Sequence, residues 1–144
     1  MRPTDELAAA ALTEIVELHR FFAIWFLGRC ANSRAAFARV TDALAPGFVR
    51  IDPAGRLQGR AAVLSALDAA HGCYAGEAFA IRVLRPRVSL IQPGLVLAIY
   101  EERQRRGGAL TRRRASALLA QAPAAPRGVA WLHLQETWID VSPG

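Results

Sequence analysis

Near the C-terminal end of the sequence, a glutamate lies among alternate residues that are otherwise apolar. Alternate residues there are apolar apart from one glutamate: Leu132, Leu134, Glu136 and Trp138. This period of two is typical of a strand that buries one face, and a buried carboxylate needs a cationic partner. The preceding apolar stretch offers Arg112 or Arg114. Two interpretations stay open: an ion pair that only stabilises the fold, or a pair that selects an anionic or hydrogen-bonding ligand at a cavity mouth.

Tyr100 and Glu102 show a similar arrangement in the segment 95–104. They share one phase of the alternation, so the Tyr100 hydroxyl and the Glu102 carboxylate are expected on the same face. The hydroxyl either serves a ligand or lies in water. Large aromatic residues complete the expected lining of a ligand cavity: Phe22, Trp25, Phe26 and Trp138.

No two of the three histidines have the spacing of metal ligands. We therefore expect no metal site. His133 is a candidate proton carrier, with a structural role as the alternative, and His19 is expected to be a hydrogen-bonded core residue. No glycine-rich phosphate loop follows an expected strand, so we expect no cofactor.

The elements that would position these residues change in character near Gly76. Before it, apolar residues recur at three- and four-residue steps, which predicts three helices: from a Thr4 cap to Gly28, from an Asn32 or Ser33 cap to Pro46, and from about Arg60 to Ala70. A short strand is expected at 48–52. After Gly76, alternation predicts strands near 79–91, 95–104, 110–121 and 129–141.

This order of elements predicts an α+β fold. Three N-terminal helices are expected to pack on one face of a strongly curved antiparallel β-sheet. Pro86 interrupts the first long strand, where it marks a bulge or a sheet edge. The length of 144 residues, 53% of them apolar, predicts one domain over residues 1–144.

The sequence also bears on location. Its longest apolar run, Phe21–Leu27, is too short to cross a membrane, and no secretory signal is visible, so we expect a cytoplasmic protein without membrane contact. Cys30 and Cys73 are expected to be reduced.

The net charge is +6 and all 18 basic residues are arginine. The densest cluster flanks the Gly107-Gly108 turn: Arg103, Arg105, Arg106, Arg112, Arg113 and Arg114. The tip of this hairpin has no aromatic residue for stacking on bases, so we do not expect nucleic-acid binding. A solvated sheet edge that is protected from aggregation by charge is the favoured interpretation.

Three stretches of sequence resemble the NTF2-like superfamily, whose cone-shaped fold wraps a bent sheet around a long first helix. The first is Asp52-Pro53-Ala54-Gly55 followed by Gly59-Arg60-Ala61-Ala62-Val63-Leu64. Two more, Tyr100-Glu101-Glu102 and the stretch 131–138, resemble its DUF4440 or SnoaL-like branch. The resemblance covers essentially the whole chain.

The resemblance implies two functions. One is binding of a small organic ligand between helices and sheet, with or without the activity of a cofactor-free isomerase, dehydratase or cyclase. The alternative is a non-catalytic module for dimerisation or partner association. A homodimer through the outer face of the sheet is expected if Trp131 or Trp138 points outward.

Ketosteroid isomerase shares this fold, and Asp52 falls on the position of its catalytic aspartate. The resemblance therefore makes Asp52 a candidate general base, with a turn-forming carboxylate as the alternative. The oxyanion donors of that enzyme are not matched, since the first helix has no tyrosine and the segment 111–116 has no acid. Isomerisation by that mechanism is not expected.

Overall fold

The computed structural model describes residues 3–139, which form three helices and six strands. The helices are α1 (Pro3–Phe26), α2 (Arg34–Thr41) and α3 (Arg60–Ala69). The strands are β1 (Leu44–Ile51), β2 (Leu57–Gly59), β3 (Phe79–Gln92), β4 (Leu95–Arg106), β5 (Ala109–Gln121) and β6 (Val129–Trp138). The predicted α+β class is confirmed.

A side-chain cap marks the start of α2, whereas α3 has no such cap and α1 begins at Pro3, before the expected Thr4 cap. The Ser33 hydroxyl accepts a hydrogen bond from the backbone N–H of Ala36 at 3.1 Å, so Ser33 is the N-cap of α2. The helix ends at Thr41, earlier than predicted, and Leu44 instead begins β1. The reason is tertiary pairing: the Ala43 carbonyl accepts from the backbone N–H of Trp131 at 2.8 Å, which draws this segment onto the sheet.

The sheet has the order β2-β1-β6-β5-β4-β3. Strands β3 to β6 form an antiparallel meander, but β1 pairs with β6 in parallel, so the sheet is mixed and not wholly antiparallel as expected. β3 is an edge strand with a register shift between Leu84 and Arg87, and Arg85 has a φ of 52° beside Pro86. Both expected roles of Pro86, bulge and edge, therefore apply.

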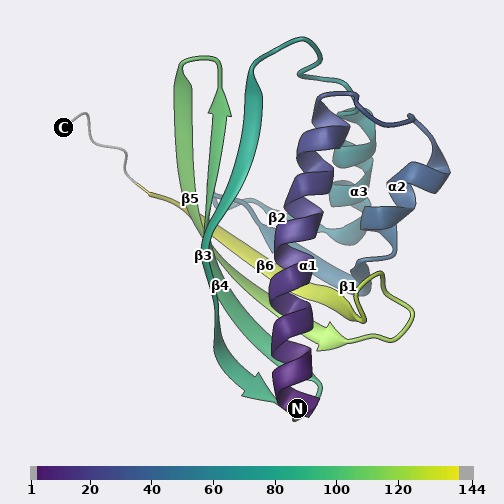
Figure 1. The fold of residues 1–144 in the computed structure, drawn as a ribbon, viewed down its shortest axis with the longest axis vertical. Helices are drawn as coiled ribbons and strands as arrows, with labels where there is room; N and C mark the ends of the chain where they lie inside the picture. The colour runs from purple at the N-terminus through teal and green to yellow at the C-terminus, as the bar shows by residue number, and fades with distance from the viewer. Residues whose placement is uncertain (1–2, 140–144) are drawn as a thin grey trace.

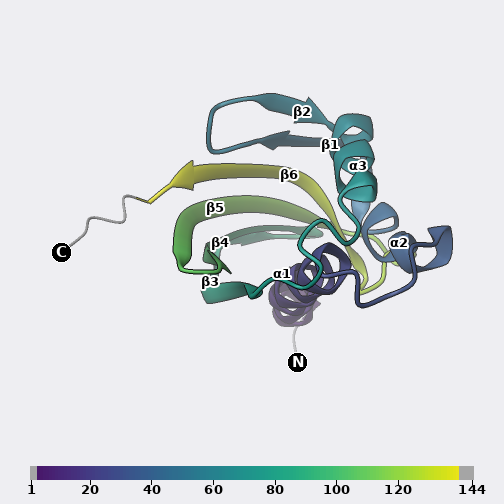
Figure 2. The ribbon, with the colours of Figure 1, turned by 90° about the horizontal axis from the view of Figure 1, so that it is seen from above.

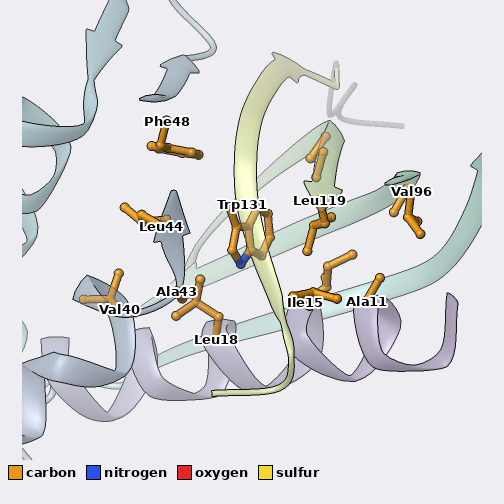
Figure 3. Packing of buried hydrophobic residues seen from close by; sticks show 14 of the residues in the cluster. Ala11, Ile15, Leu18, Val40, Ala43, Leu44, Phe48, Val96, Leu119 and Trp131 are labelled. Carbon is orange, nitrogen blue, oxygen red and sulfur yellow. The ribbon is translucent and has the colours of Figure 1, made fainter. Parts of the chain in front are cut away.

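The sheet curls around α1, and α2 and α3 close the side near β1 and β2 (Figures 1 and 2). The helices of the described chain all lie on the concave side (Figure 2). The core between them contains Ile15 and Leu18 of α1 and Leu119 and Trp131 of the sheet (Figure 3). Trp131 is therefore inside, which contradicts an outward position for it.

Two glycines connect the end of α1 to the loop after α3. Gly28 and Gly72 have positive φ, which disfavours a side chain at both, and a Cβ on Gly28 would lie only 3.2 Å from the Gly72 Cα. The carbonyls of Trp25 and Phe26 accept from the backbone N–H groups of Gly72 and Tyr74 at 2.9 and 2.8 Å. This connection fixes the part of α1 that faces the cavity described next.

No helix of residues 3–139 is long and apolar enough to cross a membrane.

Candidate ligand cavity

A cavity of about 340 Å³ lies between α1, α3 and the concave face of the sheet. Most of its wall is apolar, with side chains from all three helices and from β1: Leu18, Phe22, Phe26, Val40, Leu44, Phe48, Val63 and Leu67. The polar part of the wall comes from the sheet, from one helix residue and from Arg56 in the β1–β2 loop: His19, Arg50, Arg56, Gln58, Glu102, Gln104, Arg113 and Glu136. The cavity is thus divided into an apolar and a charged part.

Glu136 is held between two arginines in the charged part. Its carboxylate accepts from Arg50 Nε at 2.6 Å and from Arg113 Nη1 at 3.2 Å. Glu136 is only 4% exposed, so the pair of contacts compensates a carboxylate removed from water. The prediction that Glu136 is buried and bridged to an arginine of the 110–121 strand is confirmed in geometry.

His19 and Glu102 form a second buried pair. His19 Nε2 lies 3.0 Å from Glu102 Oε1, and His19 Nδ1 lies 2.7 Å from the Ile15 carbonyl. Both neighbours are acceptors, so both ring nitrogens must carry hydrogen and the imidazole is a cation. Burial lowers the pKa of His19, but the Glu102 charge and hydrogen bond outweigh it, and the pKa is raised above 6.5. Burial raises the pKa of Glu102, yet the charge and hydrogen bond of His19 bring it down to about 2.

Strand register explains why these side chains meet. Glu102 of β4 lies opposite Arg113 of β5, and their Oε2 and Nε atoms are 4.0 Å apart. Ala115 lies between Tyr100 and Glu136 in the next row. Because Ala115 and Ala117 are small, the longer charged side chains can lie over the centre of the sheet. Alternation then places all of them on the concave face.

In the charged part of the cavity, some hydrogen-bond donors lack a partner among the described residues, whereas the carboxylate oxygens all have one. Both Glu136 oxygens have arginine donors, and the Glu102 oxygens accept from His19 and from Gln104. A guanidinium carries several N–H donors. Within residues 3–139, the guanidinium of Arg113 donates one hydrogen bond, from Nη1, and its buried Nε donates none. The charged part of the cavity therefore offers unused donors beside acceptors that are already engaged.

Tyr100 lies beside the cavity without lining it. It is 1% exposed, its ring makes an edge contact with His19 at 5.3 Å, and its hydroxyl has no partner among the described residues. Burial, with the charges of Glu102 and Glu136, raises the Tyr100 pKa well above 10. The hydroxyl is therefore a neutral donor, and not in bulk water as one alternative held.

The structure brings some of the predicted ligand residues together. Phe22, Phe26, Glu102 and Glu136 line the cavity. Trp25 does not line it: the side chain is fully buried, and its Nε1 donates to the Leu67 carbonyl at 2.7 Å.

Three further predicted residues lie elsewhere. Trp138 is 49% exposed and stacks its ring against the Arg113 guanidinium, 4.8 Å away. Arg112 and Arg114 were predicted as partners of Glu136, but alternation puts them on the opposite face from Arg113. Arg112 pairs instead with Glu101 on the outer face.

The two candidate catalytic residues are outside the cavity wall. Asp52 forms a turn: its Oδ1 accepts from the backbone N–H groups of Ala54 and Arg56 at 2.9 Å each, and its Oδ2 from Arg56 Nε at 2.8 Å. The Arg56 backbone N–H is the largest influence that lowers the Asp52 pKa. His133 lies opposite Leu118 on β5 and does not line the cavity. Neither position is suited to proton transfer at a ligand in this cavity.

Sequence reasoning missed Arg50, Arg113 and the contact of His19 with Glu102. Arg113 shares its phase with Ala115 and Ala117, but the other phase of the segment 115–120 is almost as apolar, so the pattern did not distinguish Arg113 from Arg112 and Arg114. Arg50 gave no signal either, because β1 joins β6 through long-range pairing. Within residues 3–139, no group of acidic, histidine or cysteine side chains is arranged to hold a metal ion.

The curled sheet around a long first helix, with a cavity between them, is the NTF2-like fold. Similar solved structures include an NTF2-like protein of unknown function from Pseudomonas aeruginosa, with 20% identity, a TM-score of 0.80 and coverage of 91% of this chain and 99% of that one. A calcium/calmodulin-dependent kinase II hub from S. rosetta has 18% identity, a TM-score of 0.71 and coverage of 96% and 98%. A proposed kinase II association domain from Exiguobacterium sibiricum has 20% identity, a TM-score of 0.62 and coverage of 99% of both chains.

A family model gives a finer assignment. Residues 11–140 match the family described as sucrose-6-phosphate phosphohydrolase C-terminal, and the chain belongs to that family. The search of curated proteins returned no match.

Proposed function

We propose that the cavity binds a small organic anion with an apolar body. The carrying observation is a difference between acceptors and donors: every oxygen of the two carboxylates already accepts a hydrogen bond, while Arg113 retains donors without a partner among the described residues, including a buried Nε. Buried donors without acceptors are costly. A ligand that brings anionic oxygens would satisfy them, whereas a cationic ligand would find no free carboxylate.

The charge count supports one negative charge on the ligand. Arg50, Arg113 and protonated His19 carry three positive charges against the two negative charges of Glu102 and Glu136. Arg56 also lines the wall but is paired with Asp52. The apolar part, with Phe22 and Phe26, would hold a hydrocarbon or aromatic body. A volume of about 340 Å³ is at the small end of the ligand-pocket range of about 300–1,000 Å³.

A small aliphatic or aromatic carboxylate fits this description better than a sugar phosphate. The family's name refers to a phosphohydrolase of sucrose 6-phosphate, a dianion with many hydroxyl groups. The apolar half of the wall offers such hydroxyls no hydrogen-bond partners. We propose binding and not acid–base catalysis, because the His19, Glu102 and Glu136 side chains are all engaged in ion pairs.

Thermal unfolding with candidate ligands tests the proposal. Hexanoate and benzoate should raise the melting temperature, while the uncharged analogue hexanol and sucrose 6-phosphate should not. Arg113→Met should abolish the hexanoate effect. Arg112→Met is the matched control, since the neighbouring arginine on the outer face should leave the effect intact.

Two outcomes would contradict the proposal: equal stabilisation by hexanol, or equal loss of the hexanoate effect in both variants. Arg113→Lys covers the case in which Arg113→Met does not fold. It keeps the charge but removes the planar fork of donors, so it should weaken hexanoate binding without removing it.

Self-association is a second candidate function. Leu97, Ile99 and Leu118 are half-buried on the outer face, which no helix of the described chain covers. Two structural neighbours are named as a hub and an association domain. The expected homodimer would bury this strip, and light scattering should then give twice the chain mass for the wild type but the monomer mass for Leu97→Glu. The SnoaL-like branch and the cytoplasmic location stay predictions.

A further inference from the structure

A patch of arginines covers the outer face near the β4–β5 turn. Arg82, Arg103 and Arg112 lie directly opposite one another on three adjacent strands. Further arginines share this face by alternation, and together they form what we call the outer arginine patch: Arg82, Arg87, Arg103, Arg105, Arg112 and Arg114. Like charges opposite one another destabilise a sheet. The sheet therefore carries an electrostatic cost here.

One acidic residue offsets only part of that cost. Glu101 accepts from Arg112 Nε at 3.1 Å and from Arg112 Nη2 at 2.8 Å, and it also pairs with Arg103. These bonds hold two guanidinium groups in fixed positions. Within residues 3–139, no ion pair reaches Arg82, Arg105 or Arg114, which are exposed. The patch thus combines oriented arginines with uncompensated positive charge.

We propose that the outer arginine patch docks an acidic, extended segment of another protein. Charge complementarity identifies an anionic partner, and arginine pairs readily with carboxylates. Half-buried Leu84 and Leu110 lie on the same face among the arginines. They suit a polypeptide in which acidic residues alternate with apolar ones. The surface belongs to a different part of the molecule from the cavity, so the proposal does not depend on the proposed ligand.

Two features favour a polypeptide over a nucleic acid. Single-stranded nucleic acid binding relies on aromatic platforms, and the patch has none: Trp138, the nearest aromatic residue of β6, lies against Arg113 on the inner face. The half-buried leucines among the arginines also suit apolar side chains of a polypeptide, which a phosphate backbone does not offer. A second copy that covered this patch would place two positive patches together, whereas the homodimer considered above buries the strip of Leu97, Ile99 and Leu118, in other rows of the sheet than Arg103 and Arg112.

Binding measurements on the intact protein test this docking site. The probes are a fluorescent peptide of repeated Glu-Glu-Leu units and a fluorescent single-stranded oligonucleotide of equal charge. The test variant replaces Arg82, Arg105 and Arg114 with glutamine, which leaves the Glu101 pairs in place. The matched control replaces Arg20, Arg29 and Arg34, which are exposed on the helical side, so both variants lose the same charge.

The peptide should bind the wild type more tightly than the oligonucleotide. The test variant should lose about tenfold in peptide affinity, and the control variant should remain within about twofold of the wild type. An equal loss in both variants would show attraction to net charge alone and overturn the proposal. Tighter binding of the oligonucleotide, or a change of oligomeric mass in the test variant, would assign the patch to nucleic acid or to a second copy and also overturn it.

Discussion

Glu101 and Glu102 are neighbours on β4, and Arg112 and Arg113 are neighbours on β5, yet the two pairs lie in different environments. Glu102 and Arg113 face the cavity, whereas Glu101 and Arg112 face outward. The pKa of each glutamate is lowered to about 2. For Glu101 the largest cause is the Arg112 hydrogen bond, while for Glu102 burial acts in the opposite direction and the charge of His19 outweighs it.

Equal pKa values therefore describe two different kinds of contact. The arginine partners of the outer pair are partly open to water, with side chains 38% exposed for Arg103 and 27% for Arg112, although Glu101 itself is only 8% exposed; water screens these partners, so the contribution of the pair to stability is smaller. The inner pair has lost its water, so each charge depends on its partner. Strand alternation thus places glutamate–arginine pairs on both faces of the same two strands. The comparison can be tested by removing one charge at a time on each side.

The largest expected effect is that of Glu136→Ala. This change leaves Arg50 and the mostly buried Arg113 without their shared carboxylate, and it should cost about 3 to 5 kcal/mol of unfolding free energy. Glu101→Ala removes a carboxylate with the same number of arginine partners on the outer face, and it should cost about 1 kcal/mol or less. Urea denaturation of both variants measures the difference. A loss below about 1 kcal/mol for Glu136→Ala would make the inner network equivalent to the outer one.

The second prediction concerns the charge of His19. Glu102→Gln keeps the size of the side chain but removes its charge, so burial should dominate and the His19 pKa should fall from above 6.5 to below it. Glu101→Gln is the control and should leave His19 unchanged. Titration of the imidazole by NMR, with His133 as an internal reference, measures the shift. The stability cost should be about 1 to 3 kcal/mol.

The same pair sets a pH dependence in the wild type. The Glu102 pKa is lowered from 4.5 to about 2, so its stabilisation is present above pH 4.5 and is lost as the pH falls toward 2. The His19 pKa is raised above 6.5, so its stabilisation is present below pH 6.5 and is lost as the pH rises through the raised value. The pair should contribute most between pH 4.5 and 6.5. Glu102→Gln should flatten the alkaline part of this profile, and an unchanged profile would contradict the assignment.

The fold could be predicted from local patterns because helix caps and two-residue alternation act over short distances. Ser33, Pro86 and the Gly107-Gly108 turn fell where the pattern placed them. Strand β2 and the parallel β1–β6 pairing could not be predicted this way. The β1–β6 pairing depends on contacts between segments more than 80 residues apart, such as Val49 with His133, and no local period encodes that. Strand β2 has only three residues, Leu57–Gly59, which is too short to show an alternation.

The site was only half predictable for a similar reason. Glu136 was found because its phase is otherwise apolar. The phase of its partners was ambiguous, since the segment 115–120 is almost wholly apolar in both phases. A register shift between Leu118 and Leu119 adds to the ambiguity on the β6 side. Strand pairing shows that Arg113, and not Arg112 or Arg114, is the partner of Glu136 on β5.

The smallest expected effect is that of Asp52→Asn, which extends the comparison to a carboxylate in a turn. Asp52 is 4% exposed, yet its arginine partner, Arg56, is largely in water. Asparagine keeps an Oδ1 acceptor for the backbone N–H groups of Ala54 and Arg56 and loses only the charged contact. The cost should therefore be about 1 kcal/mol or less, and hexanoate binding should not change because Asp52 does not line the cavity. Unfolding in urea and the hexanoate melting shift measure the two effects. Loss of hexanoate binding with unchanged stability would instead show that Asp52 contributes to ligand binding.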